Sequence, residues 1–341
     1  MTTAEAAVRR PKRRPGRYVL QRVNERVFPD PAALAETIAR VTAHQHRSLR
    51  RARCSDAGRR ALTVVETVDA RPLHVDDHGR YWRASVHIDG ATTLRHPGSP
   101  AIAAQVAAVA AGFLVQLDDL PGPPIADAIP GFRDFRRRQV ALDDAVSADA
   151  WGRRADCGRE IDVLRRHGSL VDELEAACER GLLPRRTVHN DAKTDNVLVD
   201  DATGEGLCMV DLDTVAVGTV LFDVGELVRT AATTGAEDDA ETPPVLRHRH
   251  LEAVFGSYLA TAGHVLAANE VALFALAGPL MTYEAALRFL TDHLDGDVYF
   301  RTARPGHNLD RARAQLRLLD ALVGAREQMA EMVGRAVGHE P

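Results

Sequence analysis

The segment TVHNDAKTDNVL, residues 187–198, carries the side chains of this chain best suited to chemistry. Asp191 lies two residues after His189, and Asn196 follows five positions later. At this spacing the aspartate can accept or orient a hydroxyl proton, while the asparagine turns back to hold a metal ion on phosphate oxygens. Lys193 lies between them, where an ammonium group would neutralise charge on a phosphoryl group in transit. The pattern therefore predicts phosphoryl transfer to a hydroxyl.

A second acidic residue downstream supports this interpretation. Asp211, in VDLDT, follows Asn196 by fifteen residues and stands at the end of an apolar strand, which is where a kinase places its metal-binding aspartate. Asp and Asn also favour turns, so Asp191 and Asn196 could instead stabilise a turn between two strands. The position of Asp211 favours the kinase-like reading and predicts that Asn196 and Asp211 hold the metal.

Three neighbouring residues are expected to support the chemistry without performing it. His189 is expected to bond the backbone of the loop. Asp213 is expected to act as a structural acceptor, and Asp223 to cap the helix that follows it. The apolar residues around them predict short strands on either side of the turn at Thr203 and Gly204, over 197–199 and 207–210.

The remaining elements change in character along the chain. The N-terminal part predicts strands over 18–23, 62–68 and 81–88, with a helix that begins at Asp30 and Pro31. From Pro100 onward the pattern is helical almost throughout, with long helices expected over 102–120 and 308–337.

This change near residues 89–97 predicts a bilobal α+β protein. We expect a disordered basic leader over 1–16, because this segment is rich in proline and charge and has no periodicity. An N-terminal nucleotide-binding lobe is expected over 17–95. A helical C-terminal lobe with the catalytic and substrate-binding residues is expected over 96–341.

Composition excludes several classes of function. The 341 residues are 45% hydrophobic and 27% charged, the balance of a globular enzyme. Because 43 Lys and Arg face 48 Asp and Glu, the net charge is −5, and no general basic field exists to bind nucleic acid. No apolar run is expected to approach the ~18 residues of a membrane span.

The cysteines and the N-terminus point to the cytoplasm. Neither C-x-x-C nor zinc-ligand spacing occurs among the four cysteines, Cys54, Cys157, Cys178 and Cys208. The basic residues of the leader are not followed by the apolar region of a secretory signal. We expect a cytoplasmic monomer.

The chain resembles the aminoglycoside phosphotransferase and choline kinase superfamily, and within it the N-acetylhexosamine 1-kinases. The resemblance runs from about Arg17 to about Leu319. Its markers are RYVLQRVNERVFPDP, WRASVHIDG, IPGFRDF, VHNDAKTDNVLVDDATG, VDLDTVAVGTVLFDVGELVR, RFLTDHLDGDVYF and HNLDRARAQL. It implies a protein-kinase-like fold, ATP with Mg²⁺, and transfer of the γ-phosphate to a sugar hydroxyl, here the anomeric one.

The resemblance also assigns residues. Asp191 matches the catalytic base and Lys193 the lysine of the same loop, while Asn196 and Asp211 match the magnesium ligands. Arg22 falls on the strand position that often holds the nucleotide-binding lysine, and Glu36 on the following helix is its expected partner. Arg288 and Tyr299 match positions that resemble sugar contacts; a surface arginine and a core tyrosine are the alternative reading.

One departure from the family concerns the N-terminus. The family has two strands and a glycine-bearing turn before RYVLQR, and that turn covers the ATP phosphates. Only 16 residues precede Arg17, and their single glycine is Gly16, whereas two strands of ~5 residues and a turn need more chain. We therefore expect a truncated N-terminal lobe without a glycine loop. A start codon assigned too far downstream, a kinase with a reduced lobe and a pseudokinase are the competing explanations.

Two other functions stay open at this stage. An aminoglycoside or another natural product could replace the sugar; a polycation would need carboxylates around the acceptor site, for which the candidates are Glu226, Asp292, Asp295 and Asp297. A catalytically impaired pseudokinase is the third possibility, although the complete set of Asp191, Lys193, Asn196 and Asp211 argues against it.

Overall fold

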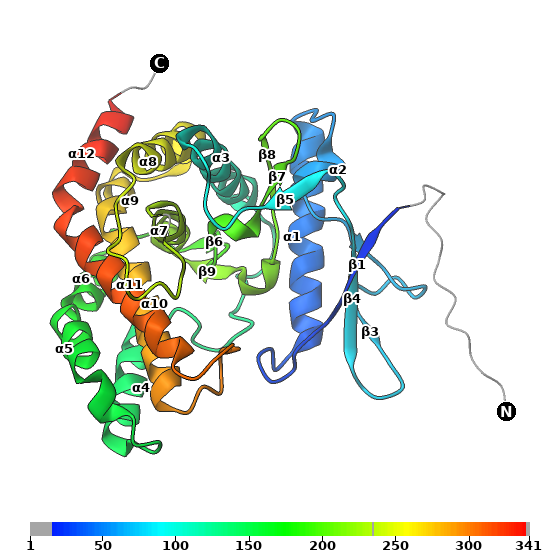
Figure 1. Cartoon of the computed structure of the whole chain (residues 1–341). Coiled ribbons are helices and arrows are strands. Elements are labelled where there is room, and N and C mark those ends of the chain that lie inside the picture. Colours follow the sequence, from blue (N-terminus) through cyan, green and yellow to red (C-terminus); the bar gives the residue numbers. More distant parts are fainter. Residues whose placement is uncertain (1–15, 234, 339–341) are drawn as a thin grey trace.

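The computed structural model describes residues 16–233 and 235–338. A strand-rich N-terminal part and a larger helical part lie side by side, and α1, Pro31–Arg51, stands between the N-terminal sheet and the helical part (Figure 1). The predicted α+β class, with small antiparallel sheets and a larger set of helices, is thereby observed. The predicted leader lies outside the described residues except for Gly16, so the expectations of disorder and of a missing glycine loop stay predictions.

The N-terminal sheet is antiparallel, with the strand order β1-β4-β2 and with β3 also paired to β4. Its strands are β1 Tyr18–Arg22, β2 Val64–Val65, β3 His74–Val75 and β4 Tyr81–Val86. The strand predicted over 62–68 is thus much shorter than expected. The chain turns back at once after it, since Thr67 N donates to Arg71 O and Ala70 adopts a left-handed φ of 58°.

Helix α1 begins where its sequence predicts. Asp30 caps the helix by accepting the Ala33 N–H at 2.9 Å, and Pro31 occupies the first turn, where it loses no hydrogen bond. Leu34, Ile38 and Val41 recur at helical spacing and bury one face of the helix. A short helix, α2 Ala57–Arg60, follows.

Two further small antiparallel sheets contain the remaining strands. One consists of β5 Ala91–Thr93, β7 Val197–Asp200 and β8 Gly206–Met209, and the other of β6 Arg186–Val188 and β9 Ala216–Gly218. The pairing of β5 with β7 joins a strand from before residue 95 to one from the helical part. The lobe boundary at 95/96 remains a proposal.

The helical part contains α3 Pro100–Leu117, α4 Phe135–Ala148, α5 Gly158–Arg166, α6 Ser169–Glu179, α7 Val220–Ala231, α8 His248–Ala262, α9 Ala268–Ala272, α10 Phe274–Leu294, α11 His307–Gly324 and α12 Arg326–Val337. Single 3-10 turns occur at Arg154–Cys157, Thr194–Asn196, Leu212–Thr214 and Gly263–Val265. The single helix predicted over 308–337 is two helices separated at Ala325, directly after Gly324, a residue of low helix propensity.

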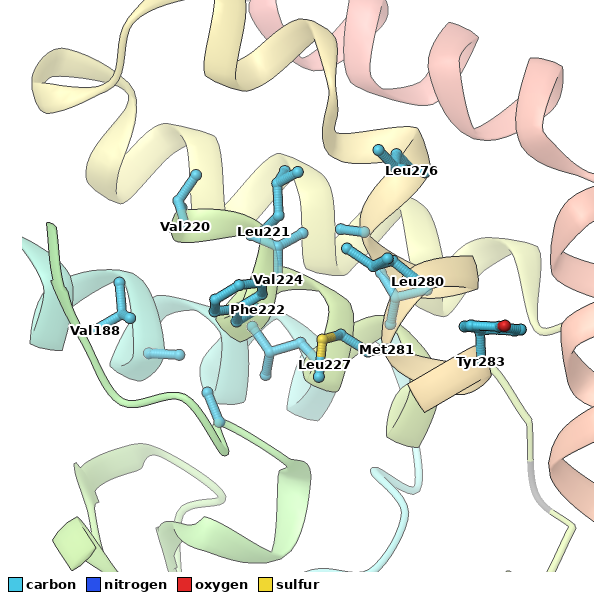
Figure 2. Packing of buried hydrophobic residues seen from close by; sticks show 14 of the residues in the cluster. Val188, Val220, Leu221, Phe222, Val224, Leu227, Leu276, Leu280, Met281 and Tyr283 are labelled. Carbon is cyan, nitrogen blue, oxygen red and sulfur yellow. The ribbon is translucent and has the colours of Figure 1, made fainter. Parts of the chain in front are cut away.

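Helix α7 forms the centre of the hydrophobic core. Figure 2 shows Leu221, Val224 and Leu227 of α7 gathered with Leu280 and Met281 of α10. The two helices approach so closely that a Cβ atom at Gly225 would lie 2.3 Å from the Ala277 carbonyl oxygen. Only glycine fits at this contact, which fixes α7 and the strands before it relative to α10.

Helix α3 corrects one expectation from composition. Its 18 residues are long and apolar enough to cross a membrane by length and composition, so the prediction that no apolar run approaches this length was wrong. One side of α3 is built into the protein core, where Ala103, Val106, Phe113 and Leu114 are buried. A core helix accounts for this composition, since alanine and branched residues pack closely against a neighbouring helix.

Candidate active site

One buried carboxylate, from α7, holds the backbone of the loop between β6 and β7. Asp223, in the first turn of α7, accepts the backbone N–H of His189 at 2.9 Å and that of Asn190 at 2.8 Å. Burial raises the pKa of Asp223, and these two N–H groups act in the opposite direction. Asp223 therefore positions the loop and does not serve as the helix cap predicted from sequence.

His189 has the scaffold role expected of it. Its Nε2 lies 2.9 Å from the Val210 carbonyl oxygen, and its ring packs edge-on against Phe113. Asn190 adopts a left-handed φ of 64° and donates to the Thr214 carbonyl at 3.0 Å. These bonds fix the backbone on the N-terminal side of Asp191.

Asp191, Lys193 and Asn196 lie together at the end of this loop. Asn196 Nδ2 donates to Asp191 Oδ2 at 3.0 Å and to the Asp191 carbonyl at 2.8 Å. Lys193 Nζ lies 3.5 Å from the same Oδ2. Burial lowers the pKa of Lys193, but the carboxylates of Asp191 and Asp195 outweigh it and raise that pKa. Among the described residues no hydrogen bond reaches Asp191 Oδ1, which leaves this oxygen available to a hydroxyl.

Asp211 lies beside this cluster because β7 and β8 are neighbours. Val210 N donates to the Asn196 carbonyl at 2.8 Å, so Asp211 begins next to Asn196, with a left-handed φ of 58°. Partial burial in the cleft, together with the charges of Asp213 and Asp191, raises the pKa of Asp211 to about 6.

The residues present fit a magnesium ion. Unbalanced negative charge around Asp211 is what a bound cation would relieve, and Asn196 contributes a neutral amide oxygen. Protein magnesium sites often use only one or two carboxylates, with phosphate and water oxygens completing the shell. No larger cluster of metal-ligating side chains occurs within 16–233 and 235–338.

A cavity of about 310 Å³ lies between the N-terminal sheet and Asp211. Its walls come from β1, α1, β2 and β4, and Asp211 and Asp213 line its inner end. Arg83 of β4 reaches across this cavity to Asp213, to which both of its terminal nitrogens donate; Nη2 lies 2.9 Å from Oδ2. Asp213 thus has the structural acceptor role predicted for it.

The structure does not bring Arg22 and Glu36 together, so the predicted ion pair is wrong. Side chains alternate along a strand, and Val19 and Gln21 are the β1 residues that line the cavity. Arg22 consequently lies on the other face, beside Asn24 and Arg80. Glu36 is exposed on α1.

Arg288 and Tyr299 do lie together. Arg288 Nη2 donates to Tyr299 Oη at 3.3 Å, and its guanidinium packs over the rings of Phe132, Tyr299 and Phe300. Burial lowers the pKa of Arg288, but Glu284, Tyr299 and Asp191 outweigh it and raise that pKa. The Arg288 guanidinium is therefore attracted electrostatically to the Asp191 carboxylate.

An ion-pair network connects Arg288 to the loop between β6 and β7, beginning with Arg288 Nη1, which lies 3.7 Å from Glu284 Oε1. Arg133 donates to the Asn190 carbonyl through Nε at 2.8 Å, to Glu284 at 2.7 Å and to Glu226 at 3.1 Å. Glu226 also accepts two hydrogen bonds from Arg229. Arg133, Glu226 and Glu284 are each at most 6% exposed, so the network is part of the interior.

A comparison with protein-family models decides the family. Residues 5–258, well over half of the chain, match the model of the phosphotransferase enzyme family, APH. The chain belongs to this family. The predictions of a phosphotransferase and of a hydroxyl acceptor are thereby confirmed.

Solved structures agree with this phosphotransferase in fold. An aminoglycoside phosphotransferase from Alicyclobacillus acidocaldarius superposes with a TM-score of 0.57 at 15% identity, covering 95% of this chain and 88% of the other. A microcompartment-associated aminopropanol kinase gives 0.56 at 16% identity, with coverages of 92% and 87%. A spectinomycin phosphotransferase in complex with ADP and spectinomycin gives 0.55 at 12% identity, with the same coverages. At these identities the likeness concerns the fold.

Sequence reasoning missed two arginines of this phosphotransferase. Arg133 lies in the marker IPGFRDF and Arg83 in WRASVHIDG, but neither segment contains a spacing rule that gives its arginine a partner. The contacts of Arg133 with Glu284 and of Arg83 with Asp213 span 151 and 130 residues. Only the folded chain brings these charges together.

Proposed function

We propose that this phosphotransferase transfers the γ-phosphate of ATP, with magnesium, to the anomeric hydroxyl of an N-acetylhexosamine or a related sugar. The observation that carries the choice of acceptor is the surface beside Asp191. There Arg288 and Tyr299 lie next to Phe132 and Phe300, and planar donors with aromatic rings suit the hydroxyl groups and the apolar face of a sugar ring.

The catalytic loop has groups for each part of the reaction. Asp191 Oδ1 would accept the hydrogen bond of the sugar hydroxyl and orient its oxygen towards the phosphorus, while Asn196 holds the other carboxylate oxygen. Lys193 would bind the phosphoryl group as negative charge accumulates on it. Asn196 and Asp211 would hold magnesium, which supplies positive charge to the phosphates when bound.

The structure weighs against a polycationic acceptor. Such a substrate needs free carboxylates, yet three of the four candidates already have partners inside the protein. Glu226 binds Arg133 and Arg229, Asp292 accepts the N–H groups of Tyr299 and Phe300, and Asp297 pairs with Arg153. Asp295 alone is exposed. Arg133, Arg138 and Arg288 all lie within 4 Å of Glu284, and this excess of positive side chains disfavours a cationic substrate.

The test is an ADP-release assay with magnesium-ATP and a panel of acceptors: N-acetylglucosamine, N-acetylgalactosamine, glucosamine, galactose and kanamycin. We expect turnover of an N-acetylhexosamine, with the product identified as a 1-phosphate by ³¹P NMR. Asp191→Asn should lower kcat about 100- to 10,000-fold, and the matched control Asp201→Asn, in an exposed turn, should not.

Three results would contradict the proposal in whole or in part. Phosphorylation of kanamycin without turnover of any sugar would establish the aminoglycoside alternative. Wild-type protein that fails to bind magnesium-ATP would favour the pseudokinase. Asp191→Asn activity close to that of wild type would remove the role assigned to Asp191 whatever the acceptor.

A further inference from the structure

We propose that Arg83, on β4, is the cation of the N-terminal sheet that binds the nucleotide phosphates. This inference rests on the proposed use of ATP and assigns a residue that the sequence did not single out. It replaces the role predicted for Arg22.

Strand β1 brings no positive charge to the cavity. Its residues facing the cavity are Val19 and Gln21, an apolar residue and a neutral amide. Because the strand is extended, Arg22 faces away from Gln21 and cannot reach Asp211 without turning the strand over. A one-residue slip of β1 would be required, and its pairing with β4 along all five residues opposes that slip.

Strand β4 supplies a positive charge directly opposite Gln21 of β1. Arg83 is the direct cross-strand partner of Gln21, and its Nε donates to Gln21 Oε1 at 3.2 Å. It is the only basic residue among the described residues that line this cavity. Its side chain is 14% exposed, so its charge acts in a partly desolvated site.

The Arg83 guanidinium is fixed in position and orientation by its hydrogen bonds. Asp213 receives one N–H from each terminal nitrogen of Arg83, and Asp213 lies two residues from the proposed metal ligand Asp211. A guanidinium has five N–H donors, and Gln21 and Asp213 use three of them. Two donors are left for phosphate oxygens. Asp213 and Gln21 act as positioning residues that hold the fork in place.

The experiment is calorimetric titration with magnesium-ADP and, separately, with adenosine, which lacks phosphates. We expect Arg83→Gln to weaken ADP binding by about 10- to 100-fold and to leave adenosine binding unchanged, because one charge-assisted contact to phosphate is lost. Arg83→Lys keeps the positive charge but loses the forked guanidinium, so its affinity for ADP should lie between those of wild type and Arg83→Gln. Asp213→Asn, which keeps Arg83, should weaken ADP binding much less than Arg83→Gln does. The control Arg159→Gln, on an exposed face of α5, should match wild type.

Several results would overturn the proposal. If Arg83 only bridges the two parts of the protein, Arg83→Gln and Asp213→Asn will both weaken the binding of ADP and of adenosine to the same extent. If Arg22→Gln weakens ADP and Arg83→Gln does not, the predicted residue is the correct one. Melting temperatures identify any variant that fails to fold. If Arg83→Gln fails to fold, the ADP and adenosine affinities of Arg83→Lys decide whether Arg83 binds the phosphates. Wild-type protein that does not bind ADP overturns the proposed function as well, whereas ADP binding unaffected at Arg83 overturns this inference alone.

Discussion

Replacing Asp223 by asparagine tests whether one buried carboxylate positions the catalytic loop. Asp223 Oδ2 accepts the His189 N–H and Oδ1 accepts the Asn190 N–H, at 2.9 Å and 2.8 Å. Asparagine keeps the shape of the side chain but has a single acceptor oxygen. Its NH₂ group would face one of the two backbone N–H groups, so one hydrogen bond is lost and a donor–donor contact replaces it.

The magnitude follows from the type of bond that is lost. A hydrogen bond to a charged group contributes about 1.5–3 kcal/mol, and 1.4 kcal/mol corresponds to a factor of ten. The amides of residues 189–190 should therefore exchange with solvent about 10- to 100-fold faster. Since burial raises the pKa of Asp223, the neutral side chain also relieves a desolvation penalty, and global stability should fall less than loop protection does. Displacing Asp191 by ~1 Å would lower kcat by about 100-fold.

The assay is hydrogen exchange of the peptide containing residues 187–196, together with urea unfolding and phosphoryl transfer. The matched control is Asp162→Asn, because Asp162 is exposed on α5. Unchanged exchange of the His189 and Asn190 amides in a folded Asp223→Asn protein would refute the reasoning. Increased exchange with undiminished kcat would show that Asp223 holds the loop without influencing Asp191.

Three further predictions concern packing and charge. Gly225→Ala should lower the free energy of unfolding, measured with urea, by about 1–3 kcal/mol, because its Cβ would lie 2.3 Å from both Ala277 O and Met281 Cγ. The control Gly256→Ala should be neutral or stabilising, because open space surrounds this position in α8. Equal effects of the two substitutions would contradict the tight α7–α10 contact. Without magnesium, the stabilising contribution of Asp211 is present below its ordinary pKa of 3.8 and should be lost as the pH rises through about 6. The magnesium-induced rise in melting temperature should therefore appear only above that pH, and should be absent in Asp211→Asn; a rise of the same size at pH 4.5 would be inconsistent with this assignment. Arg133→Met should cost about 3–5 kcal/mol of unfolding free energy, because the buried carboxylates of Glu226 and Glu284 lose a partner, and a loss below ~1 kcal/mol would show that solvent or the remaining arginines compensate.

Local segments of the sequence were sufficient to predict that the side chains of the proposed catalytic loop lie together. Asp191, Lys193 and Asn196 lie within six residues, so the backbone between them limits how far apart they can be. The start of α1 was predictable for the same reason, since Asp30 caps a helix whose first turn it immediately precedes. Asp211 required one further step, the pairing of β7 with β8, and a short turn between the two strands makes that pairing local as well.

Tertiary structure decided which charges meet. A strand pattern predicts two alternating faces but does not say which face meets the helical part, and so Arg22 was assigned to a cavity that Gln21 and Arg83 line. The role of Asp223 was equally hidden, because a helix cap and a loop anchor have the same sequence signal. The partners of Arg133 and Arg83 come from segments more than a hundred residues away. Such contacts depend on how whole elements pack, since the energy of an ion pair depends on distance and burial in the folded chain and not on spacing along the sequence.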